Sequence, residues 1–256
     1  GMTEIQVNLK RFDIPISAGG ICPSENPSDW IRKVIGEVNS RTLGKYGEVR
    51  VVLFPPEALL PAAQAALQGV NNSLVELGSQ GLYFEDVQAG GNFGAFTTNL
   101  PAVAAVTYGC RHALIGHSEE RKQYAEIYAA AELDAATAMS ATNFLLAKSV
   151  RCAFERGLKV TYCVGETAEE RANGRGGDVF EQVRAVLATQ LETLSGIAAP
   201  DKLVIGYEPR WAIGPGKTPP GAEEIGEIVS IIKELCTKLF GVPLPVIYGG
   251  GLKEEN

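Results

Sequence analysis

The sequence lacks any pair of cysteines at the two-residue spacing of metal-binding or redox motifs. Five cysteines are spread along 256 residues, at positions 22, 110, 152, 163 and 236. Their odd number argues against a disulfide framework, and the missing pairs argue against a structural zinc site. The cysteine pattern therefore favours a reducing compartment, and we expect a cytoplasmic protein.

The sequence also lacks a long apolar run and an excess of positive charge. No stretch of about 18 apolar residues occurs, so no membrane span is predicted, and we expect no secretory signal at the amino terminus. The formal net charge of −7 does not favour nucleic acid or an anionic membrane as a partner. Hydrophobic residues make up 45% of the chain and no linker divides it. We therefore predict a single domain over residues 1–256.

Short apolar runs alternate with longer amphipathic stretches along the chain. The runs are rich in Val, Ile, Leu and Tyr, as buried parallel strands are. We predict strands at Ile5–Lys10, Val49–Phe54, Leu82–Val87, Ala113–Gly116, Lys159–Val164, Leu203–Tyr207 and Pro245–Tyr248. We predict helices at Ser28–Val38, Pro61–Leu77, Asp178–Leu194 and Ala222–Leu239, and one long helix or two within Ala125–Arg156. Regular alternation of strand and helix implies right-handed crossovers and a parallel sheet, hence an α/β protein.

Two α/β architectures compete, a doubly wound sheet and a closed barrel, and a missing motif separates them. A doubly wound nucleotide-binding sheet would carry a glycine-rich loop after its first strand. Here the first strand ends in Asn8-Leu9-Lys10-Arg11. Polar residues instead follow several different strands, which is where a (β/α) barrel assembles its active site. We therefore predict a (β/α) barrel.

His117 follows an apolar strand that ends at Gly116, and it precedes polar residues suited to opening a helix. The positive end of a helix dipole favours the neutral imidazole. A neutral imidazole can donate a hydrogen bond to a carbonyl or enolate oxygen. A capping or surface histidine would show the same local pattern, so position alone leaves both interpretations open.

Glu208 also stands at a strand end, within the segment Tyr207–Thr218. Pro209 and Trp211 would stiffen the start of the following loop, and Gly214-Pro215-Gly216 would let its backbone approach a phosphate. Such a loop is typical of a lid that excludes water from a basic carboxylate. A structural turn beside a solvated glutamate is the alternative.

Two further strand ends offer contacts for an anion. Gly249-Gly250-Gly251 follow the last predicted strand and present backbone N–H groups suited to an oxyanion. Lys10, beside Asn8, offers a point charge for a phosphate or a developing oxyanion. Each feature alone is weak, because a loose turn or a solvated lysine gives the same pattern. Proton transfer next to a carbonyl nevertheless needs a base, a hydrogen-bond donor and a cation.

Six motifs lie in chain order from residue 8 to residue 250. They are Asn8-Leu9-Lys10, Gly94-Ala95-Phe96-Thr97, Ile115–Glu119, Cys163–Thr167, Tyr207–Thr218 and Tyr248-Gly249-Gly250. Together they resemble the triosephosphate isomerase family, and the loop after Glu208 is the most specific of them. The resemblance implies a (β/α)8 TIM barrel. It also implies an aldose–ketose isomerase that interconverts glyceraldehyde 3-phosphate and dihydroxyacetone phosphate through an enediolate.

The resemblance further implies roles for individual side chains. Glu208 would be the base, and His117 would be the neutral electrophile that polarises the carbonyl. Lys10 would stabilise negative charge on the substrate, and Asn8 would orient its oxygens. Glu119 would support the site from behind these residues.

Backbone groups, cofactors and partners follow from the same resemblance. Gly214, Gly249 and Gly250 would hold the substrate phosphate through their N–H groups. Proton transfer alone needs neither a metal nor an organic cofactor, so none is expected. In the family, the loop that contains Gly94–Thr97 inserts into a second subunit, which implies a homodimer.

Several residues depart from the pattern of the family near the pocket. Leu9 stands where the family has a Trp, Arg210 where it has a small or apolar residue, and Gly251 where it often has a Ser. Asn99 replaces the polar pair that usually follows the Gly-Ala-Phe-Thr motif, and the loop Ile14–Pro27 is longer than in the family. A tetrulose phosphate, such as erythrulose phosphate, is therefore an alternative substrate. A non-catalytic protein that binds sugar phosphates is the alternative outside enzymes, although a pure binding protein would not need the base.

The predicted strands number seven, whereas the family has eight. Only residues 251–256 follow the motif after the seventh strand, and no eighth β/α unit with its glycine-rich phosphate contact is found. A β/α unit needs about 30 residues. We therefore expect the sequence to be part of a longer polypeptide.

Overall fold

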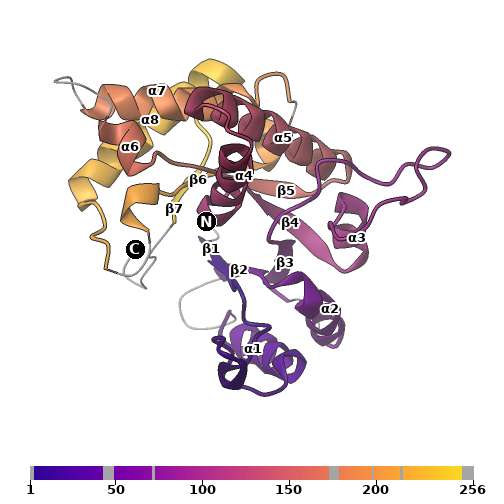
Figure 1. Cartoon of the computed structure of the whole chain (residues 1–256). Coiled ribbons are helices and arrows are strands. Elements are labelled where there is room, and N and C mark those ends of the chain that lie inside the picture. The colour runs from indigo at the N-terminus through magenta and orange to yellow at the C-terminus, as the bar shows by residue number, and fades with distance from the viewer. Residues whose placement is uncertain are drawn as a thin grey trace. The chain divides into compact units, whose positions relative to one another are not determined.

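Strands and helices alternate along the chain, as the sequence predicts (Figure 1). The structure, a computed structural model, describes residues 3–42, 49–70, 73–172, 179–197, 199–213 and 216–249. The chain divides into two units. The first comprises Gly1–Leu114 with Glu155–Lys159, and the second comprises Ile115–Phe154 with Val160–Asn256.

Parallel strands that pair in chain order form the sheet of the first unit. They are β1 (Thr3–Asn8), β2 (Val49–Phe54), β3 (Val75–Ser79) and β4 (Cys110–Ile115), which reaches the unit's border. The helices are α1 (Pro27–Thr42), α2 (Leu60–Gln68) and α3 (Ala102–Thr107), with 3-10 turns at Ile16–Ala18 and Glu57–Leu59. Asn8 at the end of β1 is in register with Phe54 at the end of β2. The carboxyl ends of these strands therefore meet at one edge.

Helices α1 and α2 pack on one face of this sheet. Ile31 and Ile35 of α1 are fully buried, in one apolar cluster with Leu53 of β2 and Leu77 of β3. Burying a side chain of this size stabilises the fold by about 1.5–3 kcal/mol. Because side chains alternate along a strand, the even-numbered residues of β2 and β3 point to the opposite face.

The second unit also pairs its strands in parallel. They are β5 (Lys159–Val164), β6 (Leu203–Tyr207) and β7 (Val246–Tyr248). The helices are α4 (Ser118–Ala130), α5 (Ala135–Glu155), α6 (Ala168–Ala172), α7 (Val179–Glu192) and α8 (Ala222–Phe240), with 3-10 turns at Pro200–Lys202 and Arg210–Ala212. Helices α7 and α8 lie side by side (Figure 1). Helix α8 buries Ile228, Ile232 and Leu235, which is the spacing of one helix face.

The predicted strand at Leu82–Val87 is wrong. The third strand is β3, and its first three residues fall within the stretch for which the sequence predicts the helix Pro61–Leu77. Helix α2 ends at Gln68. Glu76 and Gly78 lower the strand propensity of this segment, because glutamate favours helices and glycine weakens strands. Glu76 is accommodated by ion pairs from neighbouring strands, which the local sequence does not show.

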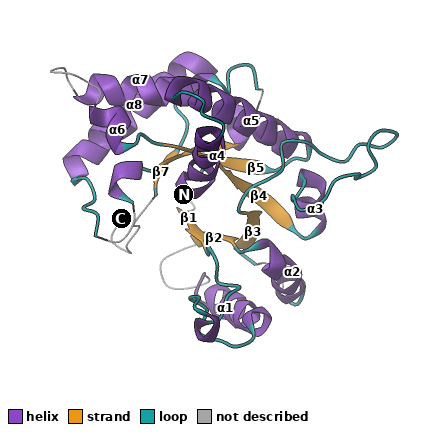
Figure 2. Cartoon of the chain, in the orientation of Figure 1, coloured by secondary structure: helices purple, strands orange, loops and turns teal. Residues whose placement is uncertain are grey.

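The segment Leu82–Val87 forms a loop instead (Figure 2). Asp86 explains why. Its Oδ1 atom accepts a hydrogen bond from the Val103 N–H at 3.2 Å, in the first turn of α3. Its Oδ2 atom accepts one from Arg156 Nε at 2.7 Å. Partners far along the chain thus override the strand propensity of the aromatic residues.

Two helices, α4 and α5, occupy the stretch where one or two were expected. Glu132 between them has a φ of 60°, which an α-helix cannot contain. Asp134 then caps α5, since its Oδ1 atom accepts from the Thr137 N–H at 2.8 Å. The other predicted strands and helices agree with the structure to within four residues, and the short helices α3 and α6 were not predicted. Within the described ranges, no helix is both long enough and apolar enough to cross a membrane.

Candidate active site

His117 caps the amino terminus of α4. Its backbone is extended, with φ −62° and ψ 164°, and its Nδ1 atom accepts a hydrogen bond from the Glu119 N–H at 3.2 Å. A nitrogen that accepts carries no proton, so the neutral ring bears its hydrogen on Nε2. His117 is therefore arranged as a donor through Nε2. In this contact Glu119 acts through its backbone, and a role for its exposed side chain stays a prediction.

Glu208 follows β6 directly and lies beside the same helix terminus. Its N–H donates to the Val164 carbonyl at 2.8 Å, which ties it to the end of β5. Its Oε2 atom accepts from the Ser118 N–H, the first residue of α4, at 3.5 Å. Because a helix amino terminus carries partial positive charge, it attracts the carboxylate. The structure thus places Glu208 and His117 together.

Two glycines near Glu208, Gly165 and Gly206, have no space for a side chain. A Cβ atom on Gly165 would lie 1.7 Å from the Glu208 carbonyl oxygen. A Cβ atom on Gly206 would lie 3.1 Å from the Cys163 sulfur. Burial, followed by the charge of Glu208 and a hydrogen bond to it, holds the pKa of the Cys163 thiol well above its usual value of 9.0. The thiol therefore stays protonated and donates to the carboxylate.

Arg121 links the backbones of Gly116 and Cys163 within the second unit. The side chain is 4% exposed. Its Nε atom donates to the Gly116 carbonyl at 2.8 Å, its Nη2 atom to the Cys163 carbonyl at 2.8 Å, and its Nη1 atom to Asn143 Oδ1 at 3.0 Å. Sequence reasoning gave Arg121 no role, because nothing in the local sequence shows that its partners include β5 and α5.

Glu166 fixes the start of the loop after Glu208. The side chain is fully buried and accepts from the Tyr207 hydroxyl at 2.8 Å, Arg171 Nη1 at 3.2 Å and Trp211 Nε1 at 3.4 Å. Arg171 also lies over the Trp211 ring, 4.5 Å from its centroid. Glu166 thereby holds the indole N–H of Trp211, and Arg171 packs on the face of its ring. The sequence motif Cys163–Thr167 contains Glu166 but does not reveal this function.

Asn8 and Lys10 lie at the carboxyl end of β1, in the first unit. The Asn8 Oδ1 atom accepts from the Lys10 N–H at 2.9 Å and from Gln80 Nε2 at 3.3 Å. Gln80 Nε2 also donates to the Lys10 carbonyl at 2.8 Å. Lys10 has a φ of 40°, an uncommon conformation that these contacts stabilise. Because the Asn8 oxygen is occupied, its NH₂ group is the end available to a substrate oxygen.

Of the predicted phosphate contacts, Gly249 is described, whereas Gly214 and Gly250 lie outside the described residues. The Gly249 N–H donates to the Tyr207 carbonyl at 2.8 Å and so extends the pairing of β6 with β7. A Cβ atom on Gly249 would lie 3.2 Å from Glu208 Cγ. Gly249 therefore makes room for the Glu208 side chain, and its contact with a phosphate stays a prediction.

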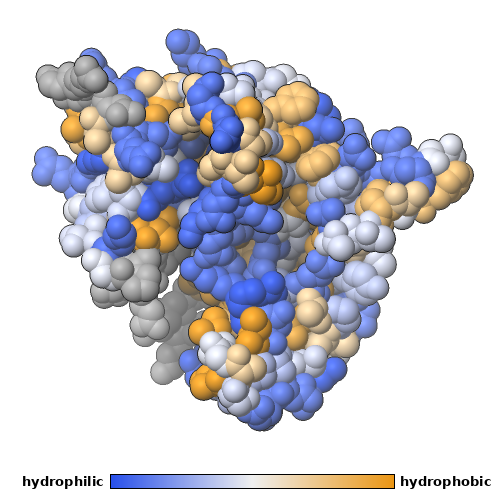
Figure 3. All heavy atoms as spheres, in the orientation of Figure 1, coloured by the Kyte–Doolittle hydropathy of each residue, from blue (hydrophilic) through white to orange (hydrophobic). Residues whose placement is uncertain are grey.

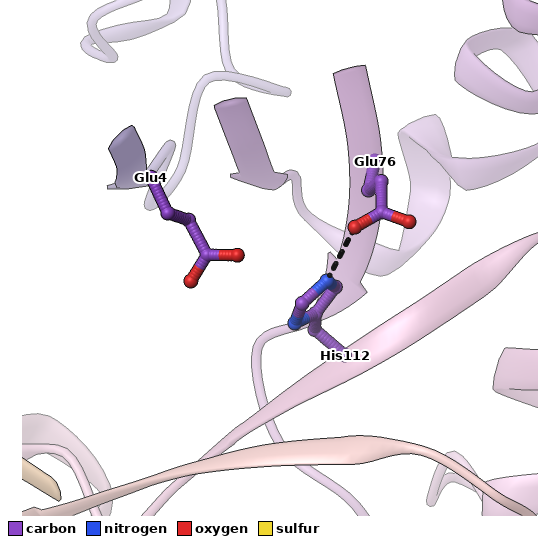
Figure 4. Close-up of side chains that lie close together, drawn as sticks. All are labelled: Glu4, Glu76 and His112. Atoms are coloured by element: carbon purple, nitrogen blue, oxygen red, sulfur yellow. Dashed lines mark hydrogen bonds and ion pairs between the residues drawn. The ribbon is translucent and has the colours of Figure 1, made fainter. Parts of the chain in front are cut away.

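A second polar cluster lies near the amino ends of β1, β3 and β4 (Figure 4). Glu4, Glu76 and His112 place potential metal-ligand atoms within 4.8 Å of one another. However, Glu76 already pairs with His112 Nε2 at 3.0 Å, Arg50 Nε at 3.5 Å and Arg111 Nη1 at 3.4 Å. Two arginines compensate the carboxylate charge that a cation would need. We therefore assign this cluster to the stability of the sheet.

Resistance to acid should depend on Glu76. The hydrogen bond from His112, helped by nearby charges, lowers the pKa of the Glu76 carboxyl from 4.5 to about 2. Because the folded-state pKa is the lower one, the ionised carboxylate stabilises the fold above pH 4.5, and this is lost as the pH falls toward 2. We expect Glu76→Gln to lower the free energy of unfolding by about 3 kcal/mol at pH 7 and by less than about half of that at pH 3.

Urea denaturation at the two pH values measures this difference. Glu37→Gln, on the exposed face of α1, is the matched control and should change stability little at either pH. An equal loss for Glu76→Gln at both pH values would contradict the assignment.

Known proteins are similar to this sequence over most of its length. Residues 25–256 match the profile of the family described as triosephosphate isomerase. The triosephosphate isomerase of Carboxydothermus hydrogenoformans is 32% identical over 97% of this chain and 84% of its own length. That of Rubrobacter xylanophilus is 35% identical over 82% of this chain and 72% of its own length. The chain belongs to the triosephosphate isomerase family.

The fold agrees with this membership. A crystal structure of triosephosphate isomerase from Bartonella henselae matches 99% of this chain and 85% of its own, with a TM-score of 0.68 and 24% sequence identity. The resemblance drawn from the motifs and the predicted TIM-barrel fold are therefore confirmed. Membership in the triosephosphate isomerase family also confirms the predicted class of enzyme, an aldose–ketose isomerase.

Proposed function

We propose that this isomerase interconverts glyceraldehyde 3-phosphate and dihydroxyacetone phosphate. The observation that carries the proposal is the pairing of Glu208 and His117 at one helix terminus. The Ser118 N–H contacts the Glu208 carboxylate at 3.5 Å, and His117 caps the same helix with its Nε2–H free of the helix backbone. A base and a neutral hydrogen-bond donor side by side are what enolisation requires.

The reaction combines two proton transfers at carbon with the transfer of one proton between the two oxygens of the enediolate. Glu208 removes a proton from the hydroxymethyl carbon of dihydroxyacetone phosphate, and the electron pair of that C–H bond forms the C=C bond of an enediolate. The Nε2–H group of His117 donates to the oxygen on which negative charge develops. Glu208 then returns the proton to the neighbouring carbon, where the C=C electron pair forms the new C–H bond. The hydroxyl proton on the oxygen of the first carbon passes to the oxygen of the neighbouring carbon, and its electron pair forms the C=O bond of the aldehyde. The proton acceptor is restored at the end of the cycle.

Other predicted residues act on the substrate's charge. Lys10 supplies a cation for the enediolate, and the Asn8 NH₂ group donates to its oxygens. Gly214 and Gly250 contribute backbone N–H groups to the phosphate, whereas the N–H of Gly249 is donated to the Tyr207 carbonyl. This chemistry moves only protons, so the proposal includes neither a metal nor an organic cofactor.

A tetrulose phosphate is the second candidate substrate, and Arg210 favours it. Arg210 begins the 3-10 turn two residues after the base and is half-buried. Burial lowers the pKa of its guanidinium, and this group makes no hydrogen bond or ion pair with any residue that the structure describes. A donor near the base suits the additional hydroxyl of a four-carbon sugar.

A coupled assay against triose and tetrulose phosphates tests both candidates. We expect kcat/KM for the triose phosphates to exceed that for erythrulose phosphate by at least about tenfold, a difference of about 1.4 kcal/mol in transition-state binding. Faster turnover of erythrulose phosphate, reduced in an Arg210→Val variant, would assign the tetrulose instead. Absence of turnover on the whole panel would refute the proposed function.

The enzyme acts as a homodimer in this proposal. The loop between β3 and α3 projects from its unit, and its tip carries apolar atoms (Figures 1 and 3). Phe93 in this loop is 76% exposed. Large exposed aromatic residues are enriched in protein interfaces, so burial of Phe93 by a second copy accounts for its position.

Replacing Phe93 with Ser should therefore convert the dimer to a monomer at micromolar concentration. Light scattering after size-exclusion chromatography measures the mass of each species. Phe144→Ser is the matched control, because Phe144 is 65% exposed on α5 and lies outside this loop. A wild-type protein that elutes as a monomer, or dimers for both variants, would contradict this arrangement.

A further inference from the structure

Glu120 contacts the peptide group that leads into His117. His117 is the cap residue of α4, and Glu120 is the third residue of the helix. A glutamate at this position commonly reaches back to the backbone N–H of the cap residue. Here the Glu120 Oε1 atom accepts from the N–H of Gly116, one residue earlier, at 2.7 Å. The contact therefore holds the residue before the histidine.

Gly116 is the point at which the chain turns from β4 toward α4. Its φ is +81°, a conformation that other residues rarely adopt, and a Cβ atom there would lie 3.0 Å from the Cys163 carbonyl oxygen. Its carbonyl accepts from Arg121 Nε at 2.8 Å. Glu120 and Arg121 thus hold the two polar groups of Gly116, one each. The backbone direction at His117 follows from the conformation that they fix.

The environment of Glu120 indicates that this contact is specific. The side chain is partly buried. Burial raises the pKa of its carboxyl group, whereas the hydrogen bond from the Gly116 N–H and the charge of Arg121 lower it. A carboxyl group that has left bulk water needs its hydrogen bond. The mechanism proposed above gives Glu120 no part in the proton transfer, so its function lies elsewhere.

We propose that Glu120 is a positioning residue, which holds Gly116 and thereby sets the orientation of the His117 imidazole. The inference rests on the proposed role of His117 as the donor to the carbonyl oxygen. The orientation of the imidazole depends on a side chain long enough to accept from the Gly116 N–H. The charge of the carboxylate is secondary. Displacement of a reacting group by about 1 Å can cost about 10²-fold in rate.

Two variants separate the effect of side-chain length at position 120 from the effect of charge. Glu120→Asp keeps the negative charge at the helix terminus but is one methylene too short to contact Gly116. Glu120→Gln removes the charge but keeps an oxygen at the same distance. We expect kcat to fall at least about tenfold in Glu120→Asp, with KM changed less than about twofold, and to stay within about threefold of wild type in Glu120→Gln.

A readout without catalysis tests the same point. The chain has two histidines, His112 and His117, so imidazole ¹⁵N resonances are few and a His112→Gln variant assigns them. In the wild type and in Glu120→Gln, we expect His117 to show one tautomer, with its proton on Nε2. In Glu120→Asp, we expect a mixture of tautomers. This measurement stays informative if the enzyme turns over none of the proposed sugars, so it distinguishes failure of this inference from failure of the proposed function.

A double-mutant cycle completes the test. If Glu120 acts through His117, the Glu120→Asp change should alter kcat less than about twofold in a His117→Gln background. A loss in Glu120→Gln as large as that in Glu120→Asp would show that charge is decisive and overturn the proposal. Wild-type rates and tautomers in both variants would overturn it as well.

Discussion

A Glu208→Gln variant should lose about 10³-fold in kcat while keeping its fold. The carboxylate is the only group proposed to take the proton, and an amide cannot take it. The geometry around the side chain survives the change, because the amide oxygen can still accept from the Ser118 N–H and the Cys163 thiol. Steady-state kinetics and thermal unfolding measure the two quantities separately.

Two further variants make the Glu208 result specific. Glu223→Gln removes an exposed carboxylate from the first turn of α8 and should leave kcat unchanged. Glu208→Asp keeps the base but withdraws it by one methylene, so its activity should lie between those of the wild type and Glu208→Gln. If Glu208→Gln retains most of the wild-type kcat, another residue is the base.

Elements that depend on apolar runs could be predicted from sequence. Strands β2, β5 and β6 coincide with the predicted Val49–Phe54, Lys159–Val164 and Leu203–Tyr207. Most of the buried residues in these strands are Val, Ile, Leu, Phe or Tyr, so local composition and tertiary environment agree. Strand β3 was missed because its second residue is Glu76, whose partners come from other strands.

In the candidate site, too, some residues could be predicted from local sequence and others could not. His117 and Glu208 could be singled out because each follows a strand, and the residues around them form specific motifs. Gln80, Arg121 and Glu120 could not, because each acts through a backbone group whose position depends on the folded structure. Sequence identifies groups with unusual chemistry, whereas the residues that hold them become visible only with coordinates.

A Gly165→Ala variant should lose both stability and activity. Gly165 is buried between two fixed groups. A Cβ atom there would lie 1.7 Å from the carbonyl oxygen of Glu208. On the other side, Gln190 holds both its N–H, at 2.9 Å, and its carbonyl, at 3.0 Å. The added methyl group must therefore move the backbone of the base or break the hydrogen bonds to Gln190.

Either outcome can be measured. Overpacking of this kind costs about 3 kcal/mol, which lowers the Tm of a protein of this size by roughly 6–12 °C, and a shift of Glu208 by about 1 Å lowers kcat by about 10²-fold. Gly226→Ala is the matched control, because Gly226 lies on the exposed face of α8 with nothing within 4 Å of the new methyl group. That variant should gain about 0.5–1 kcal/mol from helix propensity and keep its activity. If Gly165→Ala unfolds at the wild-type temperature with wild-type kcat, the backbones of Gly165 and Glu208 are farther apart than this structure places them.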